Sequence, residues 1–308
     1  MIVDVHYHFI PEVTQQRVAW ISKGVVSLAR RIGQSFDMEA VGKSVEKNVT
    51  DPTGERLIAW MEDSGVDFTC ICTIDNASVE SMTKEMAQKA NRIMGEIAQK
   101  NSKKVMALAG VDPRRPDALN MLRQCFEEFG VRGLKYHPDY GFNPSGTESY
   151  KLLQIVQDND GILLTHTGPL PPPARPKFAD PMLLADLATD FPDLKVIAAH
   201  MGMSDWRSWA GLASFQPNLY GDLAMWDVLA FGKYELFCRE LRNLLDYAGA
   251  SKVLFGTDSP IFNMLFPTKK WIQLIKDLPD NSWQGIHFSE EEVNAILGGN
   301  AASLLRLE

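Results

Sequence analysis

Two histidines near the amino terminus are the first residues whose spacing could support chemistry. His6 and His8 stand in the run VDVHYHF, and Asp4 continues the same alternation. Alternate residues of an extended strand point to one face, so this spacing can direct two imidazoles at one metal ion. A chance pair of core or surface histidines would share the pattern, so the rest of the chain must decide between them.

Further candidate ligands close apolar runs later in the chain. His166 follows ILLT, His200 follows KVIAA and Asp258 follows VLFGT. If these runs are parallel strands of one barrel, their carboxyl ends meet at one mouth, where barrel enzymes hold their catalytic groups. Together with the first two histidines, these side chains then lie at similar heights around one ring. This arrangement predicts a metal site.

The elements that must position these residues alternate between apolar runs and helical periodicity. Most of the apolar runs are continuous, as expected for parallel strands that are buried on both faces. The predicted strands are Ile2–His8, Phe68–Thr73, Val105–Val111, Gly133–His137, Ile162–Thr167, Lys195–Gly202, Leu219–Ala224 and Val253–Asp258. The clearest helical patterns are Met82–Gln99, Ala118–Phe129, Tyr150–Asp158, Met182–Thr189 and Leu236–Tyr247. This alternation predicts an α/β fold of the (β/α)8 TIM barrel type.

An insertion is expected after the first strand. Residues 9–67 separate the first two predicted strands, which is more than one crossover helix requires, and the next helix is expected at Glu55–Ser64. We interpret residues 9–50 as a lid over the barrel mouth. Near the other end, Ser289-x-x-Glu292 predicts a capping box that opens a terminal helix. With no internal repeat or linker, residues 1–308 are expected to form a single barrel domain.

Composition narrows the class of partner. The chain has 308 residues, 45% of them hydrophobic, and a formal net charge of −8. Nucleic acids and anionic membranes select basic surfaces, so we expect neither as a partner. No apolar run reaches the roughly 18 residues of a membrane span, and no basic leader opens the chain. We therefore expect a cytoplasmic protein that binds a small molecule, with homo-oligomer formation left open.

The four cysteines do not have the spacing of a disulfide framework or a zinc knuckle. Two share one strand-like run and two are isolated. They are Cys70, Cys72, Cys125 and Cys238. We expect all four to be buried, reduced thiols.

Motifs along nearly the whole chain resemble one family. They are VDVHYHF, RLIAWMEDSGVDFTCICT, GLKYHP, LLTHTG, FPDLKVIAAHMG, NLYGDLA, LFGTDSP and ILGGNAASLL. In order and spacing the chain resembles the amidohydrolase-related metal-dependent hydrolases, which include the aminocarboxymuconate semialdehyde decarboxylase-like enzymes. Residues 10–50 match nothing in that pattern. The resemblance implies His200 as the catalytic histidine and one divalent metal, usually zinc, bound by His6, His8, His166 and Asp258.

The implied ligand set has a chemical rationale. Three imidazoles and a carboxylate leave room for water on a zinc ion, and the metal lowers the pKa of that water to about 7. Asp258 can take the proton from this water and pass it to a leaving group. A neutral His200 can polarise a carbonyl or deliver a proton.

Lys135 and His137 lie on one side of the fourth predicted strand, and several roles stay open for both. Lys135 matches the position where two-metal relatives carry a carboxylated lysine, so a second metal held by His166 and His200 is one alternative. Contact with a substrate anion and a structural ion pair are the others. His137 is either a substrate contact or a wall residue.

Other residues near the expected mouth are weaker candidates for substrate binding. Arg175, in the proline-rich loop after the fifth strand, could reach a substrate carboxylate. Trp226 follows the seventh strand and could form an aromatic wall. The insertion carries Arg17 and further cations that could orient an anion, although arginines on a solvated helix face are the commoner explanation.

The ligand set leaves the reaction class open. Our first hypothesis is hydrolysis of a C–O or C–N bond, as in a lactone or amide, in a small carboxylated molecule. The alternative is non-oxidative decarboxylation of an aromatic or unsaturated acid, in which the metal and His200 handle protonation at carbon. A third hypothesis is a binding barrel without catalysis, and the intact ring of candidate ligands counts against it.

Overall fold

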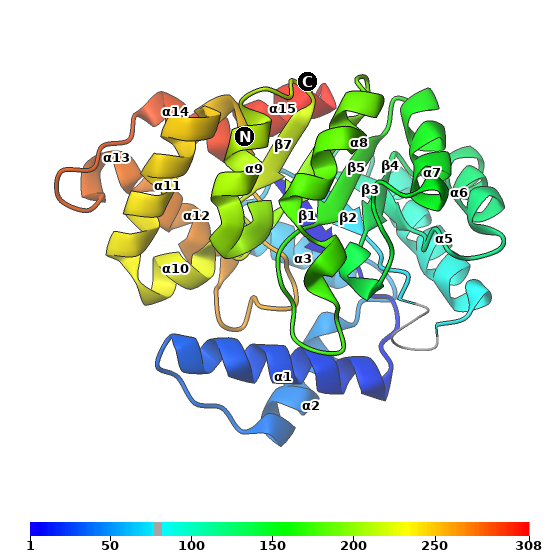
Figure 1. The fold of residues 1–308 in the computed structure, drawn as a ribbon. Helices are drawn as coiled ribbons and strands as arrows, with labels where there is room; N and C mark the ends of the chain where they lie inside the picture. The colour runs from blue at the N-terminus through cyan, green and yellow to red at the C-terminus, as the bar shows by residue number, and fades with distance from the viewer. Residues whose placement is uncertain (77–81, 308) are drawn as a thin grey trace.

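Eight parallel strands form one sheet in the order of the chain. The computed structural model describes residues 1–76 and 82–307. The strands are β1 (Val3–His8), β2 (Phe68–Cys72), β3 (Val105–Gly110), β4 (Gly133–Tyr136), β5 (Ile162–His166), β6 (Lys195–Ala199), β7 (Leu219–Asp222) and β8 (Val253–Leu254). Helices surround these strands (Figure 1), so the predicted (β/α)8 barrel is confirmed.

Closure of the barrel depends on the backbone that follows the short strand β8. Phe255 O accepts a hydrogen bond from Val5 N at 3.0 Å, and His6 O accepts one from Asp258 N at 2.9 Å. Ser259 O accepts a third from His8 N at 2.7 Å. Residues 255–259 therefore run beside β1. This pairing brings Asp258 next to His6 and His8.

The helices between strands turn one apolar face to the barrel. In α5 (Lys84–Lys100), Ala87, Ala90 and Met94 are buried at the three- and four-residue spacing of one helix face. The other helices that follow the strands are α3 (Glu55–Ser64), α6 (Ala118–Glu127), α7 (Thr147–Asp158), α8 (Leu184–Asp190), α9 (Trp206–Ala213), α10 (Asp227–Gly232), α11 (Tyr234–Ala248), α12 (Thr268–Lys276), α13 (Leu278–Asn281), α14 (Glu290–Asn294) and α15 (Asn300–Leu305).

Local sequence signals placed several helix ends well. The helix predicted at Glu55–Ser64 is α3 at those bounds. Ser289 and Glu292 form the predicted capping box at the start of α14. The helix predicted from Met82 begins two residues later as α5, because the Thr83 hydroxyl accepts from Met86 N and caps it.

Two of the predicted strands end three or four residues earlier than expected, and this corrects the placement of two site residues. β6 ends at Ala199 rather than Gly202, and β8 ends at Leu254 rather than Asp258. His200 has a φ of 66° and Asp258 a φ of 55°. The left-handed conformation of these residues cannot continue a strand ladder. Both side chains therefore leave from turns after the strands.

The insertion forms two helices at one end of the barrel. α1 (Gln15–Arg31) and α2 (Met38–Val49) lie at the end opposite the two termini (Figure 1). Thr14 caps α1 by accepting from Arg17 N at 3.1 Å. The two helices share an apolar cluster with the segment after β8, formed by Val18, Ile21, Val25, Val41, Val45, Ile261, Leu265 and Phe266 among others. The insertion is thus packed onto the mouth of the barrel.

The structure bears on membrane-spanning helices and on the state of the cysteines. In the part of the chain that the structure describes, no helix has the length and apolarity of a membrane span. All four cysteines are free and buried, as predicted.

Candidate metal centre and active site

Three of the predicted metal ligands converge on one point at the carboxyl end of the barrel. His6 Nε2 lies 3.2 Å from His8 Nε2. Asp258 Oδ1 lies 2.7 Å from His8 Nε2 and 3.4 Å from His6 Nε2. All three side chains are buried. The two-residue spacing on β1 therefore does direct both imidazoles to one place.

Hydrogen bonds on the far edge of each ring determine which nitrogen keeps a lone pair. His6 Nδ1 lies 3.0 Å from Asp222 Oδ2. His200 Nδ1 lies 3.1 Å from Ala224 O, and His166 Nε2 lies 3.1 Å from Gly168 O. A carbonyl or ionised carboxylate only accepts, so these ring nitrogens carry the proton. The lone pairs then sit on His6 Nε2, His200 Nε2 and His166 Nδ1.

Burial favours the protonation states that bind a metal. Burial, helped by the Lys135 charge, lowers the pKa of His6 to about 3. Burial also lowers the pKa of His8 and, to a greater extent, that of His166. Burial by itself would raise the pKa of Asp258, but His8 and His6 outweigh it and hold the pKa well below its usual range. The centre therefore combines neutral imidazoles with an ionised carboxylate.

This donor set fits a divalent cation. His6 Nε2 and Asp258 Oδ1 turn lone pairs toward each other beside His8 Nε2, which is unfavourable without a positive charge between them. Asp258 Oδ1 is also buried with no hydrogen-bond partner of good geometry among the described residues. Two imidazole nitrogens and a carboxylate oxygen are ligands that zinc and manganese accept. The residues present therefore fit a divalent metal ion, as the sequence predicts.

His166 and His200 border the converging atoms. The His166 and His200 rings lie 5.0 Å apart between centroids, and the His6 and His200 rings 5.2 Å apart. Both side chains are buried. Their roles as fourth ligand and acid–base group stay predictions.

Cys72 and Asp222 also lie close to these histidines, but they contact the Nδ1 edges, which face away from the converging Nε2 atoms. Each belongs to a compact group of ligand-type atoms with His6. Cys72 Sγ lies 3.7 Å from His8 Nδ1, the nitrogen that faces away from Asp258, and burial raises the thiol pKa to about 12. Asp222 contacts His6 through Nδ1. We infer that these two residues orient the rings. Sequence reasoning missed Asp222, although the quoted motif NLYGDLA contained it at the end of a strand.

Lys135 lies inside the centre. Its Nζ lies 2.9 Å from His6 Nε2, and the side chain is buried. In the part of the chain described, no carboxylate lies within ion-pair distance of this amine, so its contact is with a histidine. A bound ion and the lysine amine would share one acceptor, His6 Nε2.

A pocket opens from the metal-ligand cluster toward α1. It holds about 630 Å³, its opening included. Arg17 is the one lysine or arginine among the described residues of its wall. The rest of the wall is formed largely by apolar and aromatic residues, with His8, His137, His166, His200 and Asp258 at its base: Trp20, Ile21, Gly24, Ile74, Tyr140, Leu170, Pro171, Met203, Met225, Ile261 and Phe262.

Three predicted substrate contacts lie outside this wall, Lys135 among them. Arg175 is exposed, and its backbone N–H donates to Asp139 O at 2.6 Å. Trp226 is buried, donates from Nε1 to His200 O at 3.4 Å, and lines a neighbouring hollow. His137 does line the pocket. Substrate contact by these three residues and by His137 stays a prediction.

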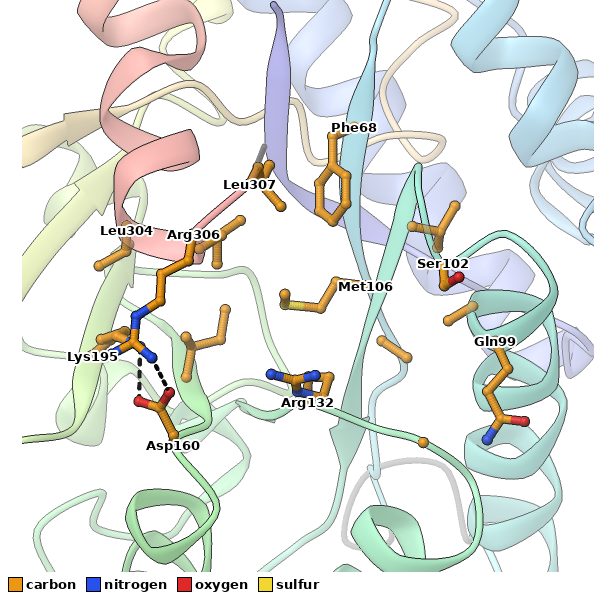
Figure 2. A pocket seen from close by; sticks show the side chains of 16 residues that line it. Phe68, Gln99, Ser102, Met106, Arg132, Asp160, Lys195, Leu304, Arg306 and Leu307 are labelled. Atoms are coloured by element: carbon orange, nitrogen blue, oxygen red, sulfur yellow. Dashed lines mark hydrogen bonds and ion pairs between the residues drawn. The ribbon is translucent and has the colours of Figure 1, made fainter.

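A larger hollow lies at the opposite end of the barrel (Figure 2). It measures about 1030 Å³, its open mouth included, and is lined by the first residues of β2, β3, β5 and β6. Asp160 there accepts from Lys195 at 3.0 Å and from Arg306 at 2.8 Å. None of the described residues that line it is a histidine. We therefore place the chemistry in the smaller pocket.

Comparison with known sequences settles the family. The profile of the amidohydrolase family matches residues 3–307. The chain belongs to the amidohydrolase family. The family resemblance of its motifs is therefore confirmed, and the chain is an enzyme of that family. No curated protein matches its sequence closely enough to count as a relative.

Solved structures resemble this chain over 99% of its length or more. A dihydroxybenzoic acid decarboxylase from Polaromonas sp. JS666, with bound manganese and the inhibitor 2-nitroresorcinol, is 20% identical, has a TM-score of 0.63 and matches over 99% of this chain and 97% of its own. A 5-carboxyvanillate decarboxylase from Novosphingobium aromaticivorans DSM 12444, with manganese, is 15% identical, has a TM-score of 0.67 and matches over 100% and 96%. An uncharacterized TIM-barrel protein from Bordetella bronchiseptica is 18% identical, has a TM-score of 0.72 and matches over 99% and 98%. At these identities the likeness establishes the fold.

Proposed function

We propose that this enzyme is a metal-dependent, non-oxidative decarboxylase of an aromatic or unsaturated carboxylic acid. The observation that carries the proposal is the composition of the pocket. Arg17, His8 and Asp258 line it together with a largely apolar wall. An apolar wall favours a ring or an unsaturated chain, and the cation favours its carboxylate. Two of the structural neighbours are decarboxylases with bound manganese, which supports the same choice.

The residues of the pocket would have three roles in such a reaction: metal binding, substrate binding and exclusion of water. A bound divalent ion, held by His6, His8, Asp258 and His166, would supply positive charge for substrate oxygen atoms. Arg17 binds and orients the substrate anion. The surrounding apolar side chains exclude water from the reacting carbon.

In this proposal His200 supplies the proton that the reaction needs. When the C–C bond to the carboxylate breaks, its electron pair stays on the substrate carbon and carbon dioxide leaves. His200 Nε2, which carries a lone pair in the neutral ring, first takes up a proton from solvent; this proton then forms the new C–H bond, and the ring returns to its neutral form. The bond between His200 Nδ1 and Ala224 O holds the ring so that Nε2 is the reactive nitrogen.

The decisive experiment measures both products of the metal-loaded enzyme on a panel of acids, lactones and amides. Release of carbon dioxide from an aromatic or unsaturated acid, lost in His200→Asn, supports the proposal. A new carboxylate formed from a lactone or amide without carbon dioxide contradicts it and supports the hydrolysis that the sequence first favoured. Bound metal with no turnover on any member of the panel would revive the binding barrel.

A further inference from the structure

His137 and Asp139 form a buried pair beside the proposed metal ligands. His137 directly follows β4, and the turn Pro138–Tyr140 brings the chain back so that Asp139 Oδ1 lies 2.7 Å from His137 Nδ1. His137 is 7% exposed and Asp139 fully buried. Proline favours such a turn because its φ is restricted to the helical range. A charged group at hydrogen-bond distance from a buried ring calls for an explanation beyond packing.

The His137 ring is held between two other rings. It stacks on Tyr140, with centroids 4.8 Å apart and planes at 15°, and on His166, with centroids 4.7 Å apart and planes at 8°. Parallel neighbours on both faces hinder rotation of the ring out of its plane. The contact with Asp139 defines which edge faces the protein. The opposite edge, which carries Nε2, is then the edge available to the pocket that His137 lines.

The tautomer of this ring follows from its partner. An ionised carboxylate accepts hydrogen bonds and cannot donate one, so Nδ1 must carry the proton. A neutral ring with its proton on Nδ1 has a lone pair on Nε2. No protein donor to that nitrogen is found among the described residues, and the ring is absent from the close groups of metal-ligand atoms.

We propose that His137 Nε2 accepts a hydrogen bond from a hydroxyl group of the substrate, with Asp139 as the positioning residue. This inference rests on the proposed function and narrows its substrate class to hydroxylated carboxylic acids. Arg17 and His137 line one pocket, so one molecule can offer its carboxylate to the first and its hydroxyl to the second. A site that accepts a hydroxyl proton rejects an analogue without that proton, because its buried acceptor then stays unpaired.

The tautomer can be measured without any turnover. Nitrogen-15 NMR of the zinc-loaded, histidine-labelled protein should show His137 as neutral with the proton on Nδ1, its signals assigned by their loss in His137→Gln. In Asp139→Asn, where the amide can also donate, this single tautomer should be lost. A wild-type ring with its proton on Nε2 would overturn the proposal, because Asp139 would then be the donor.

Ligand binding tests the donor requirement separately. Each hydroxybenzoate isomer is paired with the fluorobenzoate that has fluorine at the same position, since fluorine is small and cannot donate. For at least one position, calorimetry should show that the wild type prefers the hydroxyl by about tenfold or more, which corresponds to about 1.4 kcal/mol. His137→Phe, which keeps an aromatic ring in the stack, should remove the preference, and His137→Gln, which keeps an acceptor, should retain part of it.

The outcomes separate this inference from the proposed function. An equal preference in the wild type and His137→Phe, or none in the wild type at any position, would overturn the role of His137. Neither result depends on whether carbon dioxide is released. Circular dichroism shows whether both His137 variants fold. If one of them does not, the NMR comparison of the wild type with Asp139→Asn still decides the tautomer.

Discussion

Asp222 Oδ2 lies 3.0 Å from the Nδ1 edge of His6, while the Nε2 edge of the same ring faces His8 and Asp258. The carboxylate at the end of β7 thus determines which nitrogen of a β1 histidine is free. It accepts on its other oxygen from His200 N at 2.9 Å. One buried side chain therefore positions both a predicted ligand and the predicted proton donor.

Replacing Asp222 should weaken metal binding although Asp222 is not one of the predicted ligands. We expect Asp222→Asn to lower the affinity for zinc by about 10- to 100-fold, the usual effect of losing a carboxylate behind a metal-binding histidine. Competition with a chelating dye measures the change. Asp193→Asn, at an exposed carboxylate, is the matched control and should bind zinc as the wild type does. Equal affinities in both variants would contradict the orienting role.

The predicted ligands themselves should decide metal content. We expect about one divalent ion per chain by elemental analysis, and loss of most of it in His6→Ala or His8→Ala, because water does not replace a lost imidazole. Unchanged content in both variants would refute the assignment. A content near two that falls to one in Lys135→Ala would instead support the bridged two-metal arrangement.

His200 should separate chemistry from metal binding. His200→Asn should keep the metal and lose activity by a factor on the order of 100 or more, as expected when an acid–base group is removed. Single-turnover rates and elemental analysis on the same preparation provide the comparison. If the variant loses metal as readily as His8→Ala, His200 is a ligand and the one-metal scheme is wrong.

Arg17 should affect substrate binding more than turnover. Arg17→Gln removes the cation of the pocket wall, so we expect KM to rise about tenfold or more with a smaller change in kcat, since a charge-assisted contact to the substrate is lost. Arg30→Gln, on the exposed face of the same helix, is the control. Arg175→Gln should have a weaker effect because its side chain is exposed. Unchanged kinetics in Arg17→Gln and Lys135→Met would argue against an anion clamp, as would a neutral preferred substrate.

Asp227 should make the folded state less stable as pH rises. Burial raises its pKa well above the usual range, so the folded chain holds a proton that the unfolded chain releases. The unfolding free energy should therefore fall from the unfolded pKa, about 3.9, up to the raised folded pKa. Asp227→Asn should reduce this fall in urea unfolding at a series of pH values. The same slope in the variant and the wild type would show that Asp227 is ionised in the fold.

Local patterns in the sequence determined much of this protein. Alternation placed His6 and His8 on one face, and the apolar runs located all eight strands, because a buried parallel strand needs a continuous apolar segment. The bounds of α3 and the Ser289 capping box followed from contacts within a few residues. The family motifs pointed to the same fold.

Tertiary structure alone decided how residues far apart in the chain meet. Asp222 is 216 residues from His6, and only closure of the barrel brings their side chains together. The left-handed turns at His200 and Asp258 were missed, since apolar runs continue into them and hide where the ladder ends. From the sequence, Arg17 and Arg175 are equally possible binding residues for a substrate anion. Packing of α1 on the barrel mouth buries one beside the pocket and leaves the other in solvent.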